Sequence, residues 1–221
     1  MIIAVSMRVT SGVTYHEPRD AISHDWIEYL NAMPVTPVTV PNTLRSPSEF
    51  MQAIGARGLI LTGGDDLGPL PGEVDDDVSP NNRDATEREL LGYALANDLP
   101  VFGVCRGLHV INAYFGGTLE RELGPASPHV NSTHPVEIVS PPSELVRGIS
   151  RVVTNSFHRQ GVLLSGLARE LDAFALAHGE VVEGVRTRDG QVLAVQWHPE
   201  RVNPAAEQDR ALTRDWLARC E

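Results

Sequence analysis

The sequence has little of what would mark a secreted, membrane-bound or nucleic-acid-binding protein. It has only two cysteines, Cys105 in mid-chain and Cys220 next to the last residue, so we expect no disulfide framework and a reducing compartment, the cytoplasm. Residues 1–12 contain no basic stretch and only a short apolar run, so neither a signal peptide nor a membrane span is expected. Lys and Arg number 18 against 29 Asp and Glu, which argues against a nucleic-acid or membrane-surface partner, because binding phosphates requires clustered positive charge.

Two further absences narrow the chemistry. The cysteines and histidines do not cluster at the spacings of zinc ligands, and no G-x-x-x-x-G-K-S/T phosphate loop occurs. We therefore expect neither a metal nor a cofactor. The expected partner is a small-molecule substrate, and the sequence leaves the oligomeric state open, a homodimer included.

Length and composition predict one α/β domain over residues 1–221. Apolar residues make up 42% and charged residues 21% of the chain, close to the averages of soluble globular proteins. A chain of 221 residues can bury one sizeable core. In the first half, short runs rich in Val and Ile predict buried parallel strands at residues 2–5, 35–40, 58–61 and 100–104.

Helical patterns separate these strands. Apolar residues repeat at spacings of four and three over residues 22–33, which predicts a helix. Asp84 with Glu87 resembles a capping box at the start of a second helix. Residues 68–82 are rich in Pro and Asp and predict a long loop, either a lid or binding loop or a plain surface excursion. Strands that alternate with helices indicate a doubly wound sheet.

The second half of the chain is richer in strands than in helices. Strands are predicted at residues 136–139, 152–154, 173–177, 181–185 and 192–196. Asp189-Gly190 predicts a tight turn, and Asn203 with Pro204 predicts the N-cap and first residue of a last helix. The fold class is therefore α/β, a flavodoxin-like three-layer sandwich with a mostly parallel sheet and an antiparallel extension in the C-terminal half.

Cys105 lies between a predicted strand and a predicted apolar helix. Gly103 and Gly107 flank it in a G-x-C-x-G pattern, the arrangement of a nucleophile elbow. A strand that turns sharply into a helix leaves no room for a β-carbon on either side. The helix N-terminus also favours a thiolate over a thiol. A buried structural cysteine is the alternative.

A histidine and an acid close the last predicted strand. Residues two apart on a strand point to the same face, so Glu200 can accept a hydrogen bond from the imidazole of His198 while the other ring nitrogen faces a thiol. These residues would be the base and the group that orients it. With the elbow, they predict a catalytic triad of Cys105, His198 and Glu200.

Four segments resemble the class I glutamine amidotransferase superfamily. They are residues 62–66 (TGGDD), 103–107 (GVCRG), 155–158 (NSFH) and 196–200 (QWHPE). Cys-Arg-Gly at the elbow, with Asn-Ser-x-His downstream, is similar to the γ-glutamyl-γ-aminobutyrate hydrolase branch, which is peptidase C26-like. The resemblance covers nearly the whole chain and implies a hydrolase.

The resemblance also implies roles for individual residues. The backbone N–H groups of Gly64 and Arg106 would form an oxyanion hole, although Gly63 could replace Gly64. Residues 155–158, which are Asn155, Ser156, Phe157 and His158, correspond to the segment that binds the glutamyl group.

Two positions bear on the substrate. Many relatives carry glutamine four residues after the nucleophile, where this chain has His109. An imidazole can still donate or accept a hydrogen bond, so a contact with the glutamyl group survives. Residues 15–21 resemble a smaller group of hydrolases that remove γ-glutamyl from a phosphoramidate-bearing nucleotide, which implies a substrate contact for Arg19; a helix cap or solvated face is the alternative.

The predicted reaction is cleavage of a γ-glutamyl amide to glutamate and an amine through a γ-glutamyl thioester. One alternative is a glutaminase subunit that supplies ammonia to a partner synthetase. Another is a non-catalytic binding relative of the fold, against which the intact triad counts. An α/β-hydrolase with a cysteine elbow is less consistent, because its acid normally precedes its histidine in the chain.

Overall fold

The structure is a computed structural model, and it describes residues 1–12, 14–70, 82–124, 130–142 and 147–221. The strands predicted in the first half are present: β1 (Ile2–Ser6), β4 (Thr36–Val40), β5 (Gly58–Leu61) and β6 (Val101–Val104). They pair in parallel in the order β4-β1-β5-β6. The parallel half of the sheet is therefore confirmed.

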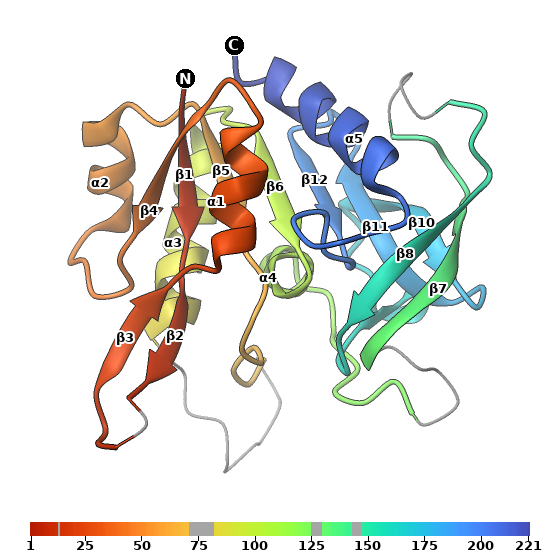
Figure 1. Ribbon diagram of the computed structural model, residues 1–221, viewed down its shortest axis with the longest axis horizontal. Helices are drawn as coiled ribbons and strands as arrows, with labels where there is room; N and C mark the ends of the chain where they lie inside the picture. Colours follow the sequence, from red (N-terminus) through yellow and green to blue (C-terminus); the bar gives the residue numbers. More distant parts are fainter. Residues whose placement is uncertain (13, 71–81, 125–129, 143–146) are drawn as a thin grey trace.

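The second half continues this sheet. It contributes β7 (Val130–Ile138), β8 (Arg151–Phe157), β9 (Val162–Leu163), β10 (Leu171–Ala177), β11 (Val181–Thr187) and β12 (Val192–Val195). β12 pairs with β6 in parallel, and the sheet then runs β12-β11-β10-β7-β8 through antiparallel pairs (Figure 1). β9 pairs with β11. The antiparallel extension is confirmed.

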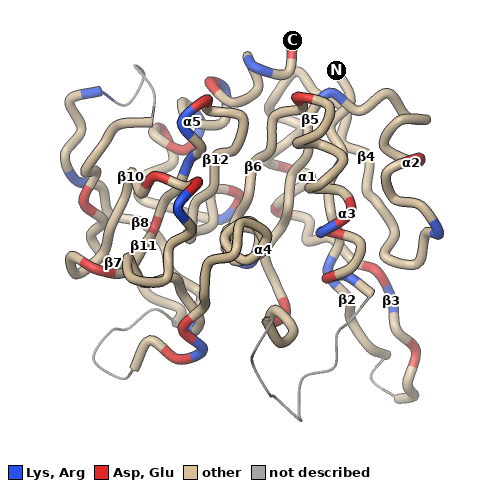
Figure 2. The backbone as a smooth tube through the Cα atoms, turned by 180° about the vertical axis from the view of Figure 1, so that it is seen from behind, with Lys and Arg blue, Asp and Glu red and all other residues tan. Residues whose placement is uncertain are grey.

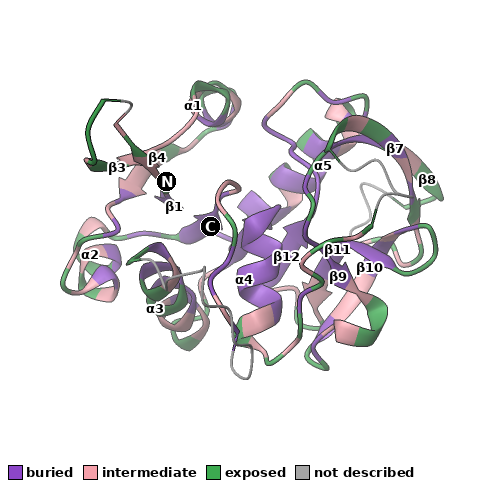
Figure 3. Cartoon of the chain, turned by 90° about the horizontal axis from the view of Figure 1, so that it is seen from below, coloured by how far each residue is buried: buried purple, intermediate pink, exposed green. Residues whose placement is uncertain are grey.

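Helices cover both faces of the sheet. They are α1 (His24–Asn31), α2 (Pro47–Ile54), α3 (Asn82–Ala96), α4 (Arg106–Tyr114) and α5 (Ala206–Ala218), with a short 3-10 turn at Leu164–Gly166. Seen from below, α1 and α5 lie on one side of the sheet and α2, α3 and α4 on the other (Figure 3).

Alternation along the central strands produces two apolar layers. Ile3 and Val5 of β1 pack in the layer that holds Trp216 of α5, whereas Ala4 packs in the layer that holds Leu90 of α3 and other buried residues of α2 and α4. Side chains two apart on a strand share a face, so a fully apolar run supplies both layers at once. The three-layer α/β sandwich is confirmed.

Two predicted helix starts are wrong. Asp84 lies inside α3, which already includes Asn82, so it is no N-cap, and both Asp84 and Glu87 accept hydrogen bonds from Arg106 instead. α5 begins at Ala206, after an N-cap at Ala205. Asn203 still accepts from the Ala205 N–H at 3.3 Å, but it lies before the N-cap position.

The segment after β1 also differs from the sequence-based expectation. β2 (Arg8–Ser11) and β3 (Pro18–Ala21) form a separate antiparallel hairpin, which projects at the same end of the sheet as the start of α4 (Figure 1). α2 was not predicted either, although the Ser46 side chain accepts from the Glu49 N–H at its start. Of the predicted loop at residues 68–82, positions 71–81 lie outside the described residues.

Charge and hydropathy are distributed without long blocks. Figure 2 shows the Lys and Arg positions scattered among the Asp and Glu positions of the described chain. Among the helices of the described residues, none has the length and apolar character needed to cross a membrane.

Candidate active site

The strand β6 turns directly into α4 at Cys105. This residue adopts φ 53° and ψ −105°, a left-handed backbone conformation that costs free energy for a residue with a β-carbon. Its N–H donates to the Val195 carbonyl oxygen of β12 at 2.8 Å. The fold therefore holds the cysteine in a strained, fixed turn at the carboxyl end of the parallel strands.

The two flanking glycines are needed for close packing. A β-carbon on Gly103 would lie 2.6 Å from Ile111 Cδ1, and one on Gly107 would lie 2.3 Å from the Leu61 carbonyl oxygen. Neither position can hold a larger side chain without a shift of the surrounding chain. The steric reason predicted for the G-x-C-x-G pattern is confirmed.

His198 and Glu200 are in contact, as predicted, but they do not lie on a strand, which was the predicted reason for the contact. β12 ends at Val195, and the two residues lie in the turn that follows, where the Arg201 N–H donates to the His198 carbonyl oxygen at 3.2 Å. His198 Nδ1 lies 2.7 Å from Glu200 Oε1. The carboxylate only accepts when ionised, so Nδ1 carries the proton and Nε2 is left to face the thiol.

Asn155 holds the backbone of this turn. Its Oδ1 accepts from the His198 N–H at 2.8 Å, and its Nδ2 donates to the carbonyl oxygens of His198 at 2.8 Å and Val202 at 3.1 Å. Its own N–H donates to Asn203 Oδ1 at 3.1 Å. The side chain that sequence resemblance assigned to substrate binding is thus engaged with the protein backbone, where it positions His198.

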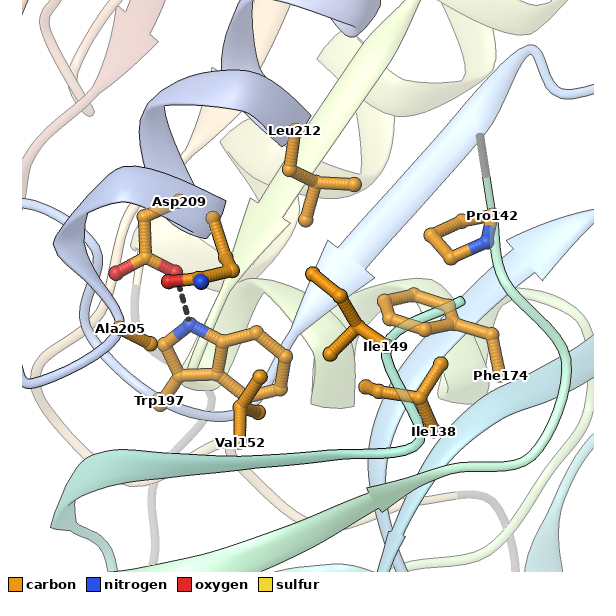
Figure 4. Close-up of a pocket in the computed structure, with 10 residues that line it drawn as sticks. Ile138, Pro142, Ile149, Val152, Phe174, Trp197, Ala205, Asp209 and Leu212 are labelled. Atoms are coloured by element: carbon orange, nitrogen blue, oxygen red, sulfur yellow. Dashed lines mark hydrogen bonds between the residues drawn. The ribbon is translucent and has the colours of Figure 1, made fainter. Parts of the chain in front are cut away.

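The hydrogen bonds that hold this turn extend to α5. Asp209 accepts from Asn203 Nδ2 at 2.6 Å and from Trp197 Nε1 at 2.8 Å. It borders an apolar cavity of about 30 Å³ between α5 and the sheet (Figure 4). Burial raises the pKa of Asp209 to about 7, against the two hydrogen bonds that lower it. A chain of contacts therefore links α5 to the histidine.

Cys105 and His198 favour an ion pair. Burial alone would raise the pKa of the Cys105 thiol, but the charge of His198 and a hydrogen bond to it lower the pKa below its ordinary value. Burial would lower the pKa of His198, yet the charges of Cys105 and Glu200 raise it to about 9. The thiolate and imidazolium forms are therefore both favoured at neutral pH.

This ion pair predicts the pH dependence of thiol alkylation. Cys105 should react with iodoacetamide at a nearly constant rate between pH 7 and 8, and its reactivity should fall only on acidification through the depressed thiol pKa. Above about 9 the imidazolium is lost and the pair breaks. Cys220 is the internal control, because it is buried and burial raises the pKa of its thiol to about 12.

Mass spectrometry of the two cysteine peptides across this pH range measures the effect. A Cys105 rate that rises through an unperturbed thiol pKa of about 8.5 would contradict the ion pair. The Cys220→Ala variant should give the same profile for Cys105.

A cavity of about 210 Å³ opens beside the thiol. It is lined by seven of the residues predicted for the site, namely Gly64, Cys105, Arg106, His109, Phe157, His158 and His198. Charged side chains of Asp65, Asp66, Arg159 and Arg201 also line it. Most of the predicted site therefore surrounds one cavity.

Four other predicted residues do not line this cavity. Asn155 and Ser156 are buried in β8, and Arg19 lies on the β2–β3 hairpin, where it is more than half exposed and pairs with Glu17. Glu200 does not line it either, but reaches it through His198. The structure thus brings Cys105, His198 and Glu200, the residues of the predicted triad, together and leaves Arg19 apart.

The glycine loop after β5, residues 62–66, reaches the predicted triad residues at Gly63 and borders the cavity at Gly64. A β-carbon on Gly63 would lie 2.8 Å from His198 Cε1, so this residue passes directly beneath the imidazole. Gly64 has φ +96° and lines the cavity. Both positions therefore require glycine, one for close approach and one for its backbone conformation.

His109 occupies the wall of the cavity as a neutral imidazole. Its Nε2 lies 2.8 Å from Gln196 Oε1, and burial lowers its pKa to about 3. The amide oxygen only accepts, so Nε2 carries the proton and Nδ1 is left as an acceptor. Gln196 is a partner that sequence reasoning did not assign.

His158 also lines the cavity, and a buried acid lies close to its ring. Its Nδ1 donates to the Gln160 carbonyl oxygen at 2.8 Å, and its Nε2 lies 3.6 Å from the buried Glu183. Burial would lower its pKa, but the bond to Glu183 and the charge of Glu183 raise it. Sequence reasoning missed Glu183, although a single acid within an otherwise apolar strand was a signal for it.

In the described part of the chain, no group of three or more His, Cys, Asp or Glu side chains is arranged so that it could hold a metal ion.

Known proteins share sequence and fold with this chain. The family model of peptidase C26 matches residues 1–200. A Schizosaccharomyces pombe protein is 31% identical over 163 residues, which are 66% of this chain and 62% of that protein. The chain thus spans less than two thirds of the length of this relative.

Two relatives with longer matches carry names that state a reaction. The γ-glutamyl-CDP-amidate hydrolase of Campylobacter jejuni is 24% identical, and the match covers 92% of each chain. The γ-glutamyl-γ-aminobutyrate hydrolase of Escherichia coli O157:H7 is 28% identical, over 88% of this chain and 85% of the relative.

A solved structure shares the fold. The glutaminase domain of Trypanosoma brucei CTPS with bound acivicin superposes with a TM-score of 0.69 at 17% identity, covering 99% of this chain and 93% of that chain. At this identity the likeness supports the fold alone.

Proposed function

Because this chain belongs to the peptidase C26 family, we propose that it is a hydrolase that cleaves a γ-glutamyl amide into glutamate and an amine. The observation that carries the proposal is the set of Cys105, His198 and Glu200 at the edge of a cavity of about 210 Å³. The names of the C. jejuni and E. coli relatives support the choice of a γ-glutamyl substrate.

The first half of the proposed reaction forms a thioester. The Cys105 thiolate attacks the γ-carbonyl carbon, a C–S bond forms, and the carbonyl oxygen becomes an anion. The backbone N–H groups of Gly64 and Arg106 donate to this oxyanion. His198 then gives its Nε2 proton to the leaving nitrogen, the C–N bond breaks, and the amine departs.

Water completes the reaction. His198, now neutral, takes a proton from water, and the oxygen of that water attacks the thioester carbon. The C–S bond breaks, glutamate leaves, and the thiolate and imidazolium return. Glu200 keeps the imidazole in the tautomer that this cycle needs and stabilises its charged form.

The amine product is proposed to be larger than ammonia. His109 replaces a glutamine found in many relatives, and the charged residues Asp65, Asp66, Arg159 and Arg201 line the cavity beyond the thiol. A site that binds the remote part of a large amine lowers the barrier with that binding energy, so removing the amine should reduce turnover as well as affinity. Cys105 and Cys220 are both unpaired, which supports the further proposal of a cytoplasmic location.

A substrate panel with the isolated protein tests the function. We expect kcat/KM for γ-glutamyl-γ-aminobutyrate or a γ-glutamyl phosphoramidate to exceed that for glutamine by about 100-fold or more, as lost remote contacts of about 3 kcal/mol imply. If glutamine is the best substrate, or if activity requires an added synthetase, the protein is an ammonia-donating glutaminase instead. The Cys105→Ala variant serves as the blank in every assay.

A further inference from the structure

Glu87 is a buried carboxylate beneath the cavity that the proposed reaction does not use. It lies on α3 with a fully buried side chain. Its Oε1 accepts from Ser6 Oγ at 2.7 Å and from Arg83 Nε at 2.9 Å. Its Oε2 accepts from Arg106 Nη1. One carboxylate therefore joins two buried guanidinium groups and a hydroxyl from β1.

Arg83 links Glu87 to the glycine loop. Its Nη2 donates to the carbonyl oxygens of Thr62 at 2.8 Å and Gly63 at 3.0 Å, and its Nη1 pairs with Asp65 at 3.3 Å. These three positions surround Gly64, whose N–H is one of the two proposed oxyanion donors. The guanidinium thus fixes the path of the loop from both sides of that donor.

Arg106 links Glu87 to the turn at Cys105. It is the first residue of α4, and its own backbone N–H is the second proposed donor. Its side chain is 2% exposed and is held by Glu87 and Asp84, both on α3. The side chain therefore fixes the first turn of α4 against α3.

The charges of this cluster compensate one another. Burial would raise the pKa of Glu87, but Arg106 and Arg83 lower it below the ordinary value, so the carboxylate is ionised. Removing charges from water is costly, and apolar side chains of similar volume would stabilise a core at least as well. The cluster instead fixes the relative positions of its members, because guanidinium groups bind oxygen atoms in a fixed fork. An apolar core would not do this.

We propose that Glu87 is a positioning residue for oxyanion stabilisation. Through Arg83 and Arg106 it sets the spacing between the backbone amides at Gly64 and Arg106. The inference rests on the proposed hydrolysis of a γ-glutamyl amide. Since the oxyanion exists only in the transition state and the tetrahedral intermediate, the spacing affects kcat and leaves ground-state substrate binding nearly unchanged.

Glu87→Gln tests this role, with Glu89→Gln as the matched control. Glu89 lies on the same helix but is exposed, and its carboxylate accepts from the N–H and the hydroxyl of Ser48. We expect kcat of Glu87→Gln to fall by about 10- to 100-fold, as for a misplaced or lost oxyanion donor, with KM within about twofold of wild type. Glu89→Gln should match wild type in both.

Two further measurements separate positioning from general damage. The affinity for a γ-glutamyl aldehyde, whose adduct with the thiol places an oxygen at the oxyanion position, should fall by the same factor as kcat. The rate of Cys105 alkylation by iodoacetamide, which forms no oxyanion, should stay within about twofold of wild type. A thermal melt reports whether the variant is folded.

Ser6→Ala provides a milder variant if Glu87→Gln does not fold. It removes the hydroxyl that donates to the Glu87 carboxylate at 2.7 Å and accepts from the Thr62 N–H at 3.0 Å, while both guanidinium contacts of Glu87 remain. We expect kcat to fall by about two- to tenfold with KM unchanged, because the carboxylate keeps its two charged partners. An unchanged kcat in the folded variant, or an alkylation rate that falls as much as kcat, overturns the role of Glu87. A wild-type protein that cleaves no γ-glutamyl amide overturns the proposed function, and this inference with it.

Discussion

Cys105→Ala should reduce kcat for a γ-glutamyl amide by about five to six orders of magnitude, as loss of the nucleophile does in comparable triads. Without the thiol no thioester can form, and only direct attack by water remains. The residual rate would come from the oxyanion donors and from substrate binding. Steady-state hydrolysis of the best substrate of the panel measures the effect.

Cys220→Ala is the matched control for this prediction. Cys220 is buried, and its thiol donates to the Trp216 carbonyl oxygen at 3.7 Å, far along the chain from the elbow. We expect its kcat to equal that of wild type. Full activity in Cys105→Ala would remove the nucleophile assignment and the thioester with it.

His198→Ala should lower kcat by about three or more orders of magnitude, because the residue supplies the proton for the leaving amine and activates water. Glu200→Gln should lose less. Its amide oxygen can still accept from His198 Nδ1, which lies 2.7 Å from the present carboxylate oxygen. The charge that raises the pKa of His198 is lost, however, so we expect the alkaline limb of the pH–rate profile to move to lower pH.

Glu207→Gln on the exposed start of α5 is the control for Glu200→Gln. It should leave both kcat and the pH profile unchanged. If Glu200→Gln is as active as wild type with a saturating substrate and has the same pH profile, another residue orients the base.

The fold was predictable where burial leaves a simple pattern. Runs such as residues 58–61 are apolar on both faces because two helical layers cover the sheet, and they predicted the parallel strands. The β2–β3 hairpin has mostly exposed or half-buried residues, so it lacks such a pattern. Asp84 was misread as a cap because its partner Arg106 is remote in sequence, and sequence spacing cannot show a remote ion pair.

The placement of the proposed triad was predictable for a similar reason. The glycines beside Cys105 and the two-residue interval between His198 and Glu200 are local features, visible in the chain itself. The groups that hold these residues in place cannot be identified from the sequence alone. Asn155 reaches His198 across 43 positions, and Ser6 reaches Glu87 across 81. Only the fold decides which remote polar groups share a buried space.

The central claim is that Cys105 forms the covalent intermediate, and one measurement tests it most directly. The protein is treated with a γ-glutamyl diazoketone, the loss of activity is followed, and the modified peptide is mapped by mass spectrometry. We predict one adduct per chain, on Cys105, formed in proportion to the activity lost. In His198→Ala the same adduct should form more slowly. Modification of Cys220 alone, or full activity after complete labelling of Cys105, would contradict the account.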